Sequence, residues 1–204
     1  EDVARSFFAF TDAALQGAPV PGLGGWMHGY YFSMPLPADM LGLPIVQLEF
    51  LAIILGHMVF LPIVGGGRAV LMTDSETSSK ITDNDGANTV MTQWLHDQLM
   101  QVQTTAAFDA ITHLYGEMNP FADLASRGRL DELAALAKQL GIRTTRLPIP
   151  PAFTALLESF RTRFGPITAQ PGALRARARS ERTAPLVLTP RTSPTPPATP
   201  TPPA

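Results

Sequence analysis

The chain has 204 residues, 45% of them hydrophobic, which is enough for one ordinary globular domain with appendages. Its formal net charge of −2 gives no overall basic surface, so nucleic acid would have to be bound through local patches and metal ions. The absence of cysteine excludes disulfides and thiolate zinc sites.

The two ends of the chain differ from its middle. The first residues, EDVARSFFAF, are acidic and lack the positive region and the cleavage site of a signal peptide. We therefore expect an intracellular location, in the cytoplasm or the nucleus, and a chain that starts inside a longer polypeptide. Residues 169–204 turn to Arg-Ala alternation and then to a Pro/Thr-rich run, TPRTSPTPPATPTPPA. Such a segment buries too little apolar surface to offset its ordering entropy, which predicts a disordered tail.

The first elements predict a hairpin followed by a helix. The apolar and aromatic run SFFAFT, residues 6–11, predicts a strand that ends at Asp12. The turn-rich GAPVPGLGG then leads to WMHGYYFS, residues 26–33, which predicts a second, antiparallel strand, and MPLP is a candidate short third strand. From Pro44, IVQLEFLAIILGHM is apolar at helical spacings and predicts a helix with Glu49 in its second turn.

One stretch of that helix has to be tested as a membrane span. Residues 48–64, LEFLAIILGHMVFLPIV, are almost long enough, but they include Glu49, His57 and Pro62. A spanning helix needs about 20 predominantly apolar residues and rarely carries such groups. We therefore interpret this stretch as a buried helix of a globular domain and expect no membrane partner.

The second half alternates strands and helices. After a Gly-rich break, RAVLMT, residues 68–73, predicts a strand that again ends on an acid, Asp74. SETSSKIT predicts a short helix, residues 87–102 a longer amphipathic helix, residues 108–114 a last strand, and residues 119–126 a short helix. A hairpin followed by strands that alternate with helices predicts an α/β domain with a mixed sheet flanked by helices.

Four acids lie in apolar surroundings on these elements: Asp12, Glu49, Asp74 and Asp123. Charged groups are rarely buried unless they are paired or bound to a metal. Carboxylates that cluster repel one another and need cations, and sites made only of oxygen ligands favour magnesium or manganese. Taken singly, an acid of this kind can also cap a turn or a helix or complement a helix dipole. Four such acids brought together favour a metal site.

The sequence around these acids resembles the ribonuclease H domains of retrotransposon reverse transcriptases. The matching stretches are FTDAAL, QLEFLA, LMTDSE and, most specifically, HLYGEMNPFADLASR. The resemblance implies a ribonuclease H-like domain over residues 1–127 and a helical extension over residues 128–168, in which RLDELAALAKQL and the run after PIPP predict helices. The disordered tail, residues 169–204, follows this extension.

The resemblance also implies a function. It implies a metal-dependent endonuclease that hydrolyses the RNA strand of RNA/DNA hybrids, with a reverse transcriptase domain upstream in the same polyprotein. Two Mg²⁺ ions, or Mn²⁺, would be held by all four acids. Asp12 would bridge both ions, Glu49 and Asp74 would hold the ion on the leaving-group side, and Asp123 would complete the site of the water-activating ion. Contacts to 2′-hydroxyl groups would select RNA.

Two other interpretations stay open. The long GAPVPGLGG loop and the lack of a strongly basic helix depart from the family and predict weak binding of the hybrid by this chain alone. One alternative is therefore a catalytically silent module that supports or tethers a polymerase domain, although the complete set of acids argues against it. The other is a different nuclease of the same superfamily, which the NPFADLASR ending disfavours.

Overall fold

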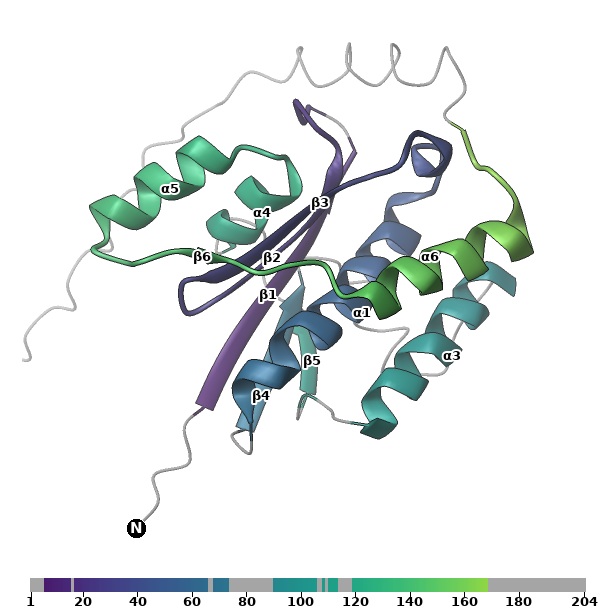
Figure 1. Cartoon of the computed structure of the whole chain (residues 1–204), viewed down its shortest axis with the longest axis horizontal. Helices are drawn as coiled ribbons and strands as arrows, with labels where there is room; N and C mark the ends of the chain where they lie inside the picture. The colour runs from purple at the N-terminus through teal and green to yellow at the C-terminus, as the bar shows by residue number, and fades with distance from the viewer. Residues whose placement is uncertain are drawn as a thin grey trace, which may run out of the picture.

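A mixed sheet with helices on both faces forms the centre of the molecule (Figure 1). The computed structural model describes residues 6–15, 17–65, 68–73, 90–105, 108, 110–113 and 119–168. The predicted mixed sheet flanked by helices is confirmed. Asp74, the short helix predicted in SETSSKIT and the tail, residues 169–204, lie outside the described residues.

Among the described residues, six strands form the sheet, in the order β5-β4-β1-β2-β3-β6. The strands are β1 (Ser6–Ala14), β2 (Gly22–Met27), β3 (Tyr30–Pro35), β4 (Arg68–Thr73), β5 (Ala110–His113) and β6 (Thr145–Arg146). The β1–β2 and β2–β3 pairs are antiparallel, whereas β1–β4, β4–β5 and β3–β6 are parallel. The carboxyl ends of β1 and β4 therefore meet at one edge of the sheet.

The helices divide between the two faces of the sheet. In the described part of the chain they are η1 (Ala38–Met40), α1 (Ile45–Val64), α3 (Val90–Thr105), α4 (Pro120–Ser126), α5 (Leu130–Gln139) and α6 (Pro151–Phe164). Figure 1 shows α1, α3 and α6 on one side of the sheet and α4 and α5 on the other. The α-helices predicted from the sequence between residues 44 and 164 lie close to these bounds wherever the structure describes them.

Three details of the predicted hairpin are wrong. β1 does not end at Asp12 but continues through it to Ala14. The expected strand over residues 26–33 is two strands, joined by a two-residue turn in which His28 and Gly29 have φ values of 49° and 91°. Turns with two positive φ values match the twist of a tight hairpin. The candidate third strand in MPLP supplies only the last two residues of β3.

Helix α1 is apolar on nearly all sides because it is buried on nearly all sides. Within the described part of the chain, it is the one helix long and apolar enough to cross a membrane, and 72% of the tested window is buried inside the fold. It packs on β1, β2 and β4 and against α3. The sequence-based interpretation of this stretch as a buried helix is confirmed.

The segment after residue 127 shares the core of the sheet. β6 extends the sheet beside β3, and Phe153 and Phe160 of α6 belong to the same buried cluster as α1. Trp94 of α3 packs edge-on against Phe160, with ring centroids 5.7 Å apart. Beyond α6, the backbone of Ile167 bonds to Asp39 and Gly42, each at 2.7 Å, which fastens this end to the loop before α1.

On the opposite face, α4 lies directly on β2 because two strand positions carry no side chain. A β-carbon on Gly24 would lie 2.2 Å from the backbone nitrogen of Ser126 and 2.6 Å from the carbonyl oxygen of Ala122. One on Gly22 would lie 2.9 Å from the carbonyl oxygen of Ser126. The run GLGG, which the sequence predicted as part of a loop, is therefore a strand whose glycines make room for a helix.

We predict that Gly24→Ala destabilises the protein by about 3 kcal/mol, because the added methyl group meets backbone atoms that cannot rotate away. Urea unfolding measures the change. Gly141→Ala is the control: its β-carbon meets open space, but its φ of 68° costs about 1–2 kcal/mol in an alanine. A smaller decrease in the free energy of unfolding for Gly24→Ala than for Gly141→Ala would contradict the close packing of α4 on β2.

His57 is a fully buried polar residue within α1. Its Nδ1 lies 3.0 Å from the carbonyl oxygen of Ile53, and its ring packs edge-on against Phe108. Its Nε2 has no hydrogen-bond partner among the described residues. Burial lowers the pKa of His57 to about 4, and the hydrogen bond to Ile53 opposes part of that shift.

We predict that the free energy of unfolding falls as the pH drops from 6.5 toward 4, by up to about 3 kcal/mol from His57 alone. The native state keeps this imidazole neutral, while the unfolded chain binds a proton below pH 6.5. His57→Leu should remove this part of the acid sensitivity in denaturant titrations at several pH values. His28→Asn, at an exposed turn, should keep it, and equal pH profiles for the wild type and His57→Leu would refute the prediction.

Candidate active site

Asp12 lies on the face of β1 that α4 covers. It sits opposite Gly24 in the antiparallel β1–β2 register, and its side chain is only 4% exposed. The hydroxyl of Ser126, the last residue of α4, donates a hydrogen bond to Asp12 Oδ2. The buried acid of β1 is thus bonded to the helix that carries Asp123.

Glu49 approaches the same edge of the sheet from α1. Its Oε1 accepts a hydrogen bond from the backbone N–H of Ala13 at 3.2 Å, and its Oε2 accepts one from the hydroxyl of Thr73 at 3.4 Å. The carboxylate, 4% exposed, therefore lies between the carboxyl ends of β1 and β4. Ala13 follows Asp12 in the chain and Thr73 precedes Asp74, so Glu49 contacts the neighbours of two other predicted site residues.

Asp123 differs from these two acids because it is partly exposed and paired with a cation. Its side chain is 38% exposed, and its Oδ1 lies 2.6 Å from Nε of Arg127, one helical turn away. An exposed i,i+4 pair of this kind contributes only a few tenths of a kcal/mol to stability. In this structure the pair directs the carboxylate of Asp123 toward Arg127.

Polar side chains at both ends of α4 attach it to the sheet. Asn119 Nδ2 donates to the carbonyl oxygen of Thr11 at 3.3 Å, just before Asp12 in β1. The hydroxyl of Ser33 in β3 donates to the carbonyl oxygen of Ala125 at 2.7 Å. Reasoning from the sequence missed the roles of these residues and of Ser126. The only signal for Asn119 and Ser126 was their place in the NPFADLASR motif, and Ser33 in β3 had none.

Apolar contacts also hold α4 against the sheet. The ring of Phe121 stacks on Trp26 of β2, with centroids 3.9 Å apart and planes 9° apart. Ala122 and Ala125 are fully buried in the same cluster, which α5 closes with Leu133. The small residues of the motif face the sheet, and its acid and its arginine lie partly exposed. The motif therefore combines a packing face with a polar face.

The chemical type of the predicted ligand atoms suits a hard divalent cation. Asp12, Glu49 and Asp123 offer only carboxylate oxygens, the ligands that Mg²⁺ and Mn²⁺ prefer. Within the described ranges, no three His, Asp or Glu side chains are grouped closely enough to hold a metal ion. Asp74 is the fourth predicted ligand, and because it lies outside these ranges its place in the site remains a prediction.

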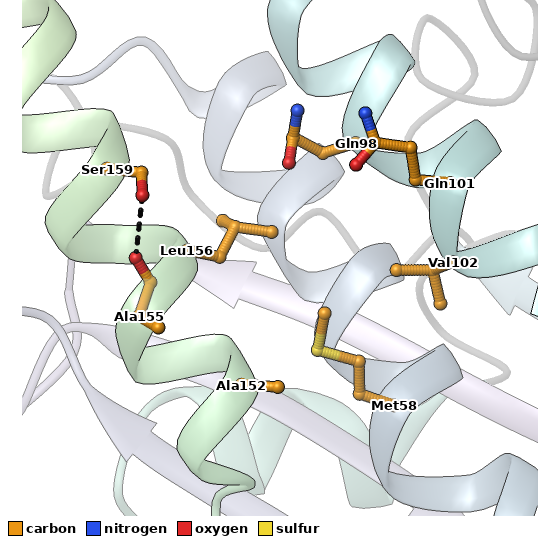
Figure 2. A pocket seen from close by; sticks show the side chains of 8 residues that line it. All are labelled: Met58, Gln98, Gln101, Val102, Ala152, Ala155, Leu156 and Ser159. Atoms are coloured by element: carbon orange, nitrogen blue, oxygen red, sulfur yellow. Dashed lines mark hydrogen bonds between the residues drawn. The ribbon is translucent and has the colours of Figure 1, made fainter.

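A separate cavity of about 400 Å³ lies between α1, α3 and α6 (Figure 2). Its lining residues are neutral: Met58, Gln98, Gln101, Val102, Ala152, Ala155, Leu156 and Ser159. Figure 2 shows the two glutamines reaching into it from α3 and Leu156 from α6. Since none of its described lining residues is charged, and Asp12, Glu49 and Asp123 are not among them, it is a poor candidate for a phosphate or metal site.

No model of a protein family and no curated protein sequence matches the chain. Its structure is similar to that of RNase H1 from the halophilic archaeon Halobacterium salinarum NRC-1, with 19% identity and a TM-score of 0.49 over 63% of this chain and 99% of that one. It is also similar to the N-terminal RNase H domain of Rv2228c from Mycobacterium tuberculosis, solved as a fusion with maltose-binding protein, with 16% identity and a TM-score of 0.44 over 65% and 98%.

Proposed function

We propose that this chain is a metal-dependent endonuclease that hydrolyses the RNA strand of RNA/DNA hybrids, as the ribonuclease H part of a retroelement reverse transcriptase. The observation that carries the proposal is the position of Glu49. Its carboxylate bonds to Ala13, the residue after Asp12, and to Thr73, the last residue of β4, so Glu49 and Asp12 lie at the same edge of the sheet. The four matching sequence stretches support the same function.

Asp12, Glu49, Asp74 and Asp123 are the proposed ligands of two Mg²⁺ ions, for which Mn²⁺ can substitute. When bound, such ions activate a water molecule and stabilise charge on the departing oxygen. The protein's own contribution is to fix the ligands. The Ala13 N–H and the Thr73 hydroxyl hold both oxygens of Glu49, and Ser126 holds Asp12. Because Asp12 and Glu49 are buried, each of these electrostatic interactions is stronger than it would be between the same groups in water.

The proposed partners are the RNA/DNA hybrid and a reverse transcriptase domain upstream in the same polyprotein. With a formal net charge of −2, the chain has no general attraction for phosphate groups. We therefore assign much of the affinity for the hybrid to the upstream domain. The proposed location is intracellular, in the cytoplasm or the nucleus, where such a hybrid is made.

A catalytically silent module that supports a polymerase domain is the second candidate. This candidate is favoured because each proposed ligand that the structure describes already has a hydrogen-bond donor from the protein. The donors are Ser126 for Asp12, Ala13 and Thr73 for Glu49, and Arg127 for Asp123. A carboxylate satisfied in this way does not need a cation to be stable in the fold. Cleavage assays separate the two candidates.

We predict that the full chain cleaves the labelled RNA strand of an RNA/DNA hybrid with Mg²⁺ or Mn²⁺, and that EDTA stops the reaction. Glu49→Gln should lower the rate roughly 100-fold or more, because it removes a charged ligand while keeping the side chain's shape. Gel analysis of the products should show internal cuts in RNA only.

Two substitutions serve as comparisons. Glu158→Gln changes an exposed acid on α6 and should leave the cleavage rate unchanged. Asp74→Asn should match Glu49→Gln if Asp74 is a ligand. A folded wild-type protein that cuts nothing with hybrid and metal in excess would reject the nuclease and favour the supporting module.

A further inference from the structure

Ser126 occupies the most crowded point between α4 and the sheet. Its side chain is 1% exposed, and its backbone nitrogen lies over Gly24, the residue paired with Asp12. A buried hydroxyl needs a hydrogen-bond partner, and at this position the partner is a carboxylate. This contact joins residues 114 positions apart in the sequence.

The hydroxyl of Ser126 is within bonding distance of two acceptors. One is Asp12 Oδ2, and the other is the carbonyl oxygen of Asp123, at 2.9 Å. A serine hydroxyl has a single proton to donate, and an ionised carboxylate is the stronger acceptor. The proton therefore belongs to the bond with Asp12.

We propose that Ser126 is a positioning residue that fixes the carboxylate of Asp12 in the orientation that binds metal. The inference rests on the proposed function, because it takes Asp12 as a metal ligand. Without the hydroxyl, the carboxylate of Asp12 loses one directional restraint, and binding a cation has to supply it. A ligand held in place before the metal arrives binds it more tightly.

The structure offers a matched control for this role. Ser33 is also a buried serine beside α4, and its hydroxyl donates to the carbonyl oxygen of Ala125, next to Ser126. Both Ser126→Ala and Ser33→Ala therefore remove one buried hydrogen bond between α4 and its surroundings. Only Ser126→Ala removes a bond to a proposed metal ligand.

We predict that Ser126→Ala weakens Mg²⁺ binding by the full chain at least about 10-fold, as is typical for partners of metal ligands, while Ser33→Ala changes it less than about twofold. Isothermal titration calorimetry with Mg²⁺ alone measures the affinity without any reaction. In cleavage assays, Ser126→Ala should need more Mg²⁺ for half-maximal rate and recover most of the rate at saturating Mg²⁺. Circular dichroism checks that each variant folds.

Ser126→Cys is a second variant in case alanine disturbs the packing of α4. A thiol is a weak donor of similar size, so the Mg²⁺ affinity should fall between those of the wild type and Ser126→Ala. Equal affinities for Ser126→Ala and Ser33→Ala, or tighter binding by Ser126→Ala, would overturn the positioning role while the wild type still binds metal and cuts the hybrid. A wild type that binds no Mg²⁺ would overturn both this role and the proposed function.

Discussion

The contact between α4 and the glycines of β2 is the constraint on which the candidate site depends. Side chains normally separate a helix from a sheet, but Gly24 has none and Ala122 and Ala125 have only methyl groups. The backbone of α4 therefore reaches the sheet. Ser126 can bond to Asp12 only because of this approach. Any change that lifts the helix separates the first predicted acid from the last.

Polar bonds make this close approach specific. Apolar packing alone would allow α4 to slide along β2, since dispersion and burial are not directional. Asn119 bonds to Thr11 at one end of the helix, and Ser126 bonds to Asp12 at the other. Two directional bonds to the same strand fix the helix in register with β1. Shape lets the helix approach, and hydrogen bonds set its position.

Much of this arrangement could be predicted from the sequence, and the failures have a common cause. The mixed sheet, the buried α1 and the short α4 followed from local patterns of apolar residues, turn residues and caps. GLGG was assigned to a loop because glycine weakens an isolated strand, and only a helix more than 90 residues later explains why it is one. The prediction that β1 ends at Asp12 failed for the same reason. β1 continues to Ala14 because its last residues pair with the GLGG strand, β2, which the sequence had not revealed.

The candidate site was predictable in its residues but not in its bonds. The acids stood out as charges in apolar surroundings, which a single sequence displays. Most of the donors that hold Asp12 and Glu49 lie far away in the sequence, and local sequence patterns do not show which distant residues will meet. The hydroxyl and backbone donors to Asp12 and Glu49 orient these carboxylates without cancelling their charge, so the bonds are compatible with a cation at the same place.

The all-round apolar surface of α1 has a consequence for how the protein is made. Roughly 90 residues separate the end of α1 from the start of α6, which supplies Phe153 and Phe160 to the same core, so at about 5–20 residues per second α1 is synthesised several seconds before that part of the core exists. During that time the nascent chain displays a helix with the length and composition of a membrane segment. Chaperones at the ribosome, and the machinery that sorts membrane proteins, would compete for it until α6 is complete.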